Sequence, residues 1–157
     1  MIFTDGPSAG CRLRWMALAI VMGVLLAAPA KARAQAPATR LFPNDGGMVL
    51  NFIKPDKAAD FEAVMAKLKE ALTTSAKPER KQQAAGWHVF KSPEMAGPNH
   101  LYVFVIYPSV KGADYQISNI LTEAFPAEAN AILQKYADAY AQGMNIVNLS
   151  LLQDMGK

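Results

Sequence analysis

The chain has 157 residues, a formal net charge of +3, and 16 basic against 13 acidic side chains. This length suits one domain with a core of its own. The basic side chains do not cluster, so the composition does not indicate a nucleic-acid-binding surface.

Residues 1–34 have the three-part layout of a cleavable export signal. Two arginines precede an apolar run over residues 15–28, and this run is shorter than the roughly 20 residues that a membrane span needs. A small-x-small pattern then predicts cleavage before Gln35. We therefore expect an exported protein, periplasmic or secreted, with no membrane segment after cleavage.

Removal of the signal changes the charge and the thiol chemistry. Of the charged residues, 12 of the 16 basic and 12 of the 13 acidic ones remain, which gives a formal charge of zero. The single cysteine, Cys11, is removed with the signal, so the mature chain can form no disulfide and no thiolate metal site. The histidines and carboxylates have no metal-ligand spacing. We expect no metal, no cofactor and no nucleic-acid partner.

A proline-rich segment over residues 35–46 is predicted to be a flexible lead-in to a single domain at 47–157. Residues 48–53 are apolar and predict a strand. A helix capped by Asp56 should follow, because an aspartate side chain accepts hydrogen bonds from the first N–H groups of a helix. The apolar stripe of this helix recurs every three or four residues: Phe61, Val64, Met65, Leu68 and Leu72. Residues 73–84, after the helix, are predicted to be a polar connection.

The second half of the domain predicts a hairpin, two helices and a final strand. Its strongest strand signal is an aromatic and β-branched run, preceded by a segment with two prolines and a glycine. A long helix should begin at Pro126 and end at Gly143. The expected elements are a strand at 86–91, a loop at 92–99, a strand at 100–107, helices at 114–124 and 126–143, and a strand at 145–152.

The order strand, helix, strand, strand, helix, strand is typical of a ferredoxin-like α+β fold. In this fold a four-stranded antiparallel sheet carries its helices on one face. The strands at 48–53 and 100–107 are apolar on both faces, whereas a sheet face in water should alternate. Since soluble monomers rarely expose an apolar patch of several hundred Å², we expect a homodimer that covers the open face.

Side-chain alternation gives an interpretation of the two faces. In the last strand, Val147 and Leu149 are expected beneath the helices, which leaves Asn148 on the open face. Asn51 would join Asn148 there if Leu50 is among the helix-facing residues.

The element order, the length and the two-faced strands over about residues 47–152 resemble the dimeric α+β-barrel superfamily. This superfamily includes antibiotic-biosynthesis-type monooxygenases, EthD-like proteins and haem-degrading enzymes. The resemblance implies two sheets closed into a barrel, with a ligand cleft inside it or between each sheet and its helices. Asn51 would match a first-strand asparagine of the haem-degrading members. Their iron-binding helix histidine has no counterpart, because His88 and His100 fall in the predicted hairpin.

Four residues are candidates for a ligand site: Asn51, Trp87, His88 and Tyr102. His88 is also the candidate catalytic base, because an imidazole exchanges protons near neutral pH. Trp87 and His88 are neighbours, so only one of them can face the open side. The hairpin register decides which, and the loop length leaves it open. A structural role for Asn51, hydrogen-bonded to neighbours or to a dimer mate, is the alternative.

The sequence thus indicates an exported, dimeric α+β-barrel protein that binds a small apolar or aromatic molecule. One alternative is a cofactor-independent enzyme of the monooxygenase type, and another is a structural or interaction module without a ligand. Whether the protein is an enzyme stays open. An enzyme needs polar groups that converge on an aromatic wall, and a structural module would have a filled interior.

Overall fold

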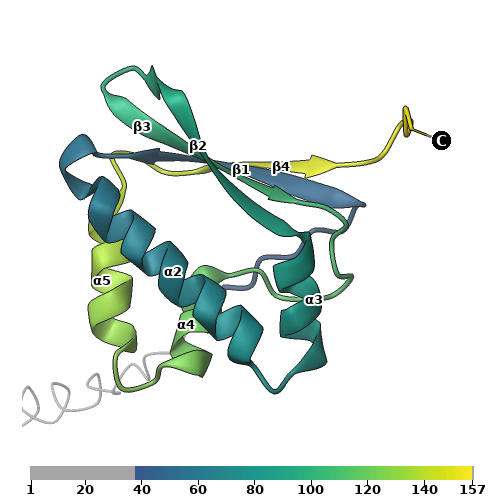
Figure 1. The fold of residues 1–157 in the computed structure, drawn as a ribbon, viewed down its shortest axis with the longest axis horizontal. Helices are drawn as coiled ribbons and strands as arrows, with labels where there is room; N and C mark the ends of the chain where they lie inside the picture. The colour runs from purple at the N-terminus through teal and green to yellow at the C-terminus, as the bar shows by residue number, and fades with distance from the viewer. Residues whose placement is uncertain (1–37, 157) are drawn as a thin grey trace, which may run out of the picture. The chain divides into compact units, whose positions relative to one another are not determined.

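The computed structural model describes residues 38–156, so the predicted export signal lies outside the described residues. One antiparallel sheet has the strand order β2-β3-β1-β4, and the helices lie on one of its faces (Figure 1). This arrangement confirms the predicted ferredoxin-like α+β fold. The strands are β1 (Gly46–Ile53), β2 (Trp87–Ala96), β3 (Asn99–Ile106) and β4 (Asn145–Leu149). The helices are η1 (Pro55–Lys57), α2 (Ala58–Thr74), α3 (Pro78–Gly86), α4 (Ile117–Ala124) and α5 (Ala129–Ala139).

The structure shows which face of β1 packs against the helices. Val49, Asn51 and Ile53 are 1%, 0% and 0% exposed and lie beneath the helices. Leu50 therefore faces the open side, so the condition under which Asn51 would share that face with Asn148 is not met. Because both faces of this strand are apolar, alternation cannot tell which one packs against the helices.

In β4 the two faces are the reverse of those predicted. Val147 pairs with Met48, so it shares the open face with Leu50, and Leu149 follows two residues later. The prediction that Val147 and Leu149 lie beneath the helices was wrong, and Asn148 takes the opposite face. The open face of the sheet consequently carries apolar side chains in all four strands, beside the polar His88 and Asn145. Its apolar residues are Met48, Leu50, Phe52, Phe90, Leu101, Val103, Val105, Val147 and Leu149.

Helix α2 covers the centre of the sheet with the predicted apolar stripe. Phe61 packs on Tyr102 and Phe104, with ring centroids 4.7 and 6.2 Å away. The predicted cap at Asp56 was wrong, because this residue lies in the short 3-10 helix η1. The residues that α2 buries are Phe61, Val64, Leu68, Ala71 and Leu72.

A helix, α3, occupies most of the segment predicted to be a polar connection at 73–84. Pro78 stands in its first turn, where a missing N–H costs nothing. Its buried side chains are polar: Arg80 and Gln83 donate to the carbonyl of Asp114 at 2.7 and 3.0 Å, and Arg80 pairs with Glu123 at 3.1 Å. A helix that buries polar groups leaves no apolar periodicity in the sequence, which explains the missed prediction.

The hairpin is longer and tighter than predicted. β2 and β3 extend into the segment predicted to be a loop at 92–99, and only Gly97 and Pro98 separate them. Gly97 has φ +63°, a conformation that favours glycine. A register shift between Lys91 and Met95 absorbs the extra length of β2. The prediction of a loop was wrong, because β2 continues past this irregularity and pairs again with β3 at Met95 and Ala96.

The ends of the domain are fastened to the sheet. α5 ends at Ala139 and not at the predicted Gly143, because Tyr140 pairs with Ile53 at the end of β1. The predicted lead-in at 35–46 is described from residue 38. There Phe42 is 2% exposed and packs edge-on against Tyr115 at 5.3 Å.

Candidate functional site

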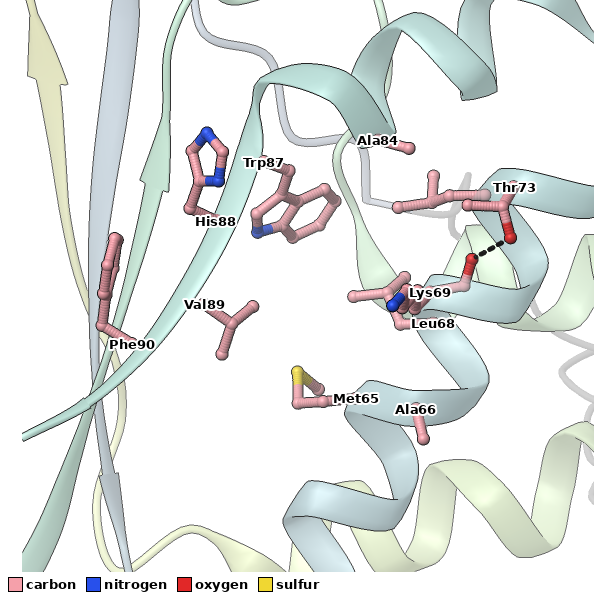
Figure 2. Close-up of a pocket in the computed structure, with 11 residues that line it drawn as sticks. Met65, Ala66, Leu68, Lys69, Thr73, Ala84, Trp87, His88, Val89 and Phe90 are labelled. Carbon is pink, nitrogen blue, oxygen red and sulfur yellow. Dashed lines mark hydrogen bonds between the residues drawn. The ribbon is translucent and has the colours of Figure 1, made fainter.

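A groove of about 520 Å³ lies between helix α2 and the edge strand β2, and we call it the α2–β2 groove (Figure 2). Ala84 of α3 borders it as well. Its volume falls within the range of small-molecule sites, which are concave and mostly apolar. The apolar side chains that line it include Met65, Leu68, Leu72, Ala84, Trp87 and Val89. Among its lining residues, Lys69 is the one with a permanent charge.

The junction of α3 and β2 places Trp87 at the groove. No loop separates the two elements, and the Trp87 backbone N–H donates to the carbonyl of Ala84 as the helix ends. The Tyr107 N–H donates to the carbonyl of Gly86 at 2.8 Å. A Cβ at Gly86 would lie 2.6 Å from the Pro108 oxygen, so only glycine permits this close approach. The start of β2 is therefore held tightly.

The indole of Trp87 packs within the aromatic core but keeps one polar atom unpaired. Its ring centroid lies 5.9 Å from that of Phe104 and 5.4 Å from that of Tyr115. Its Nε1–H is buried and has no hydrogen-bond acceptor among residues 38–156. In Figure 2 the nitrogen-bearing edge is turned toward the side of the groove where Val89 and Met65 lie. Trp87 thus offers a hydrogen-bond donor at the groove wall.

The hairpin register puts His88 on the other side of the sheet. Trp87 pairs with Ile106, which is buried beneath the helices, whereas His88 pairs with Val105 on the open face. Figure 2 shows the imidazole on the opposite side of the β2 ribbon from the Trp87 indole, although His88 borders the groove. The candidate base is thereby directed away from the groove interior.

Asn51 lies beneath the helices and makes three hydrogen bonds. Its Nδ2 donates to the carbonyls of Val49 and Tyr102 at 3.2 and 3.1 Å. Its Oδ1 accepts from the Tyr140 hydroxyl at 2.8 Å. The Tyr136 hydroxyl lies 2.7 Å from that of Tyr140 and must donate to it, because the Tyr140 proton is already used. Asn51 therefore has partners for its amide and its carbonyl within the core.

The two tyrosines beside Asn51 stay neutral. Burial raises the pKa of Tyr136 and that of Tyr140, because removal from water disfavours the charged phenolate. The hydrogen-bonded chain from Tyr136 through Tyr140 to Asn51 consequently links α5 to β1 with both phenols protonated at neutral pH. Asn51 does not line the α2–β2 groove.

Tyr102 belongs to a polar cluster beyond one end of the groove. Its hydroxyl donates to Glu62 Oε1 at 2.6 Å, and Lys91 Nζ lies 2.9 Å from the same oxygen. The hydrogen bonds from Tyr102 and Lys91 lower the pKa of Glu62, while burial raises the pKa of Tyr102. Glu62 precedes Met65 by about one turn of α2, and Lys91 follows Val89 on the same face of β2. The cluster therefore lies beyond the end of the groove that Met65 and Val89 form.

The four predicted site residues do not converge. Trp87 contributes to the groove wall, Asn51 and Tyr102 are buried outside it, and His88 has its imidazole on the open face. Sequence reasoning missed the α2 side of the groove, because Met65, Leu68 and Leu72 have the spacing of ordinary core residues. No signal in the sequence separates a residue that lines a groove from one that fills the core.

Other kinds of site receive no support from the described residues. Between residues 38 and 156, no three histidine, cysteine or carboxylate side chains lie close enough together to hold a metal ion. In the same part of the chain, each helix is too short or too polar to cross a bilayer.

Comparison with known proteins yields one structural likeness. No protein-family model matches the sequence, and no curated protein is detectably similar to it. The chain is similar to a solved structure from Caulobacter crescentus CB15 that is described as a "putative antibiotic biosynthesis monooxygenase". The two share 19% identity over 72% of this chain and 94% of that chain, with a TM-score of 0.41. This likeness assigns no residue a role.

Proposed function

We propose that the protein binds a small apolar or aromatic molecule in the α2–β2 groove. The observation that carries the proposal is the groove itself, about 520 Å³ with predominantly apolar walls on both sides. Leu68 and Leu72 supply one wall, and Trp87 and Val89 supply the other. A flat aromatic ring would gain stacking and apolar contact there without displacing a hydrogen bond.

Dimerisation through the open face of the sheet is the second part of the proposal. The apolar open face would remain in water in a monomer, which is costly and uncommon. The chain after β4 supports the same idea, because it extends away from the body of the domain (Figure 1). There Leu152 is 98% and Met155 88% exposed. A second copy would cover both the face and this segment.

Export completes the proposal. The arginines, the apolar run and the small residues within 1–34 support a cleaved signal, and the resulting protein would act in the periplasm or outside the cell. No cofactor, metal or nucleic acid is part of this proposal.

Catalysis is not part of the proposal. The enzymatic alternative requires His88 and Asn51 to act on one ligand beside Trp87. The His88 imidazole lies across the strand from the indole, and the Asn51 amide is already used in three hydrogen bonds. The observations favour a binding site over a catalytic one.

The test fills the groove and measures ligand binding. Val89→Phe places a larger ring in the groove, and Val89→Ile is the matched control that keeps the volume nearly unchanged. We expect calorimetric titration with small aromatic molecules to detect binding to the unmodified chain and to Val89→Ile. The affinity of Val89→Phe should be at least about tenfold lower, because its side chain occupies the ligand's space. Equal affinity of all three proteins would remove the α2–β2 groove as the site.

A further inference from the structure

We propose that the ligand of the α2–β2 groove carries a hydrogen-bond acceptor, such as a carbonyl oxygen, that binds Nε1–H of Trp87. This inference rests on the proposed function and specifies the chemical class of the ligand. The class is small aromatic or aliphatic molecules with an oxygen acceptor, as opposed to pure hydrocarbons.

The first step is the unpaired donor. An indole nitrogen can only donate, so it requires an acceptor when it is removed from water. Native proteins pair nearly all buried polar groups, and an unpaired one calls for an explanation. Within the described part of the chain, Trp87 Nε1 is the buried side-chain nitrogen or oxygen that lacks a partner. Every other such atom there has one.

The neighbours of the indole do not supply the acceptor. Phe104 presents only carbon. The Tyr115 hydroxyl accepts from the Val110 backbone N–H at 2.8 Å and makes no hydrogen bond to the indole nitrogen. The remaining polar groups of the groove, such as the Lys69 ammonium and the Thr73 hydroxyl, belong to the rim formed by α2. The protein therefore leaves this donor for a group from outside.

The second step is access. The nitrogen-bearing edge of Trp87 is turned toward Val89 and Met65, both of which line the groove (Figure 2). Met65 is only partly buried, and an unbranched thioether side chain adopts new rotamers easily. A ligand in the groove can thus displace the Met65 side chain and bring an oxygen atom to the indole N–H.

The charge at the groove supports the same ligand class. Lys69 carries the permanent charge among the lining residues. It takes part in none of the ion pairs among residues 38–156. Its positive charge favours a ligand with electron-rich oxygen over a cationic one. The indole N–H of Trp87 and the positive charge of Lys69 therefore favour the same class of ligand, one with an oxygen acceptor.

The test uses two probes of nearly equal shape, acetophenone and α-methylstyrene, which differ in a C=O against a C=CH2 group. Each is titrated into the full chain and into Trp87→Phe, which keeps an aromatic ring and removes the donor. Because the two probes differ in hydrophobicity, the measured quantity is the ratio of their affinities in each protein. We expect the substitution to shift this ratio against acetophenone by about fivefold to tenfold, the effect of one lost hydrogen bond.

A spectroscopic readout on the unmodified chain keeps the inference testable if Trp87→Phe does not fold. In a 15N-labelled sample, acetophenone should move the Trp87 indole N–H signal downfield, and α-methylstyrene should leave it nearly in place. The two indole signals, from Trp15 and Trp87, are told apart with a Trp15→Phe chain. If both probes bind but neither the ratio nor the indole signal distinguishes them, the inference is overturned and the proposed function stands. If neither probe binds, both are overturned.

Discussion

Replacing Asn51 with alanine tests whether this residue belongs to the core or to the ligand site. The substitution removes the two donor bonds to the Val49 and Tyr102 carbonyls and the acceptor of the Tyr140 hydroxyl. Each lost bond costs about 1 kcal/mol, and a buried hydroxyl without an acceptor adds to this cost. We expect the free energy of unfolding to fall by about 3 kcal/mol, which lowers the melting temperature by about 12 °C in a domain of this size.

The assay is denaturant and thermal unfolding, combined with titration of an aromatic ligand. Tyr140→Phe is the matched variant, because it removes only the hydroxyl that Asn51 Oδ1 accepts. Because this hydroxyl also accepts from Tyr136, the substitution breaks two hydrogen bonds and should cost about 2 kcal/mol. The double variant should cost less than the sum of the two single ones. Ligand affinity should stay unchanged in all three, since Asn51 does not line the groove. A variant that keeps its stability and loses its ligand would refute this reasoning.

Three other predictions concern pH, assembly and export. The hydrogen bond from Tyr102 lowers the pKa of Glu62 below its ordinary value of 4.5. The ionised Glu62 carboxylate therefore stabilises the fold fully above pH 4.5, and this stabilisation is lost as the pH falls through the lowered pKa. The melting-temperature difference between the parent and Glu62→Gln should therefore narrow from about pH 6 to about pH 3, and a constant difference would contradict this. Leu50→Glu places a carboxylate on the open face and should shift light scattering from dimer to monomer; a monomeric parent would remove the dimer proposal. Mass spectrometry of protein from the native host should find an amino terminus within a few residues of Gln35, and an intact first residue would overturn export.

The fold could be predicted from the sequence wherever the apolar pattern is one-sided or continuous. The α2 stripe and the aromatic run of β3 belong to this class, and the element order then leads to the sheet topology. Where both faces of a strand are apolar, as in β1, the alternation of side chains does not show which face packs against the helices. Packing against Phe61 and Tyr140 decides it instead, and the sequence does not reveal this. Helix α3 was missed because the side chains that it buries are arginine and glutamine.

The site was predictable only in part, for a geometric reason. The adjacent positions of Trp87 and His88 already required opposite faces, but the choice depended on the hairpin register. That register is fixed by the tight turn at Gly97 and the shift between Lys91 and Met95, which the composition of the segment does not disclose. The α2 wall of the groove was unpredictable, because Leu68 looks the same in a sequence whether it lines a groove or fills a core.

The central claim is that the α2–β2 groove binds a small aromatic molecule, and the most direct test locates such a molecule on the protein. Isotope-filtered nuclear Overhauser spectroscopy of the labelled chain with acetophenone reports which side chains lie next to the bound ring. We predict contacts from its ring protons to Met65, Leu68 and Val89. Contacts to Val103 and Leu50 on the open face, without any to the groove residues, would contradict the account.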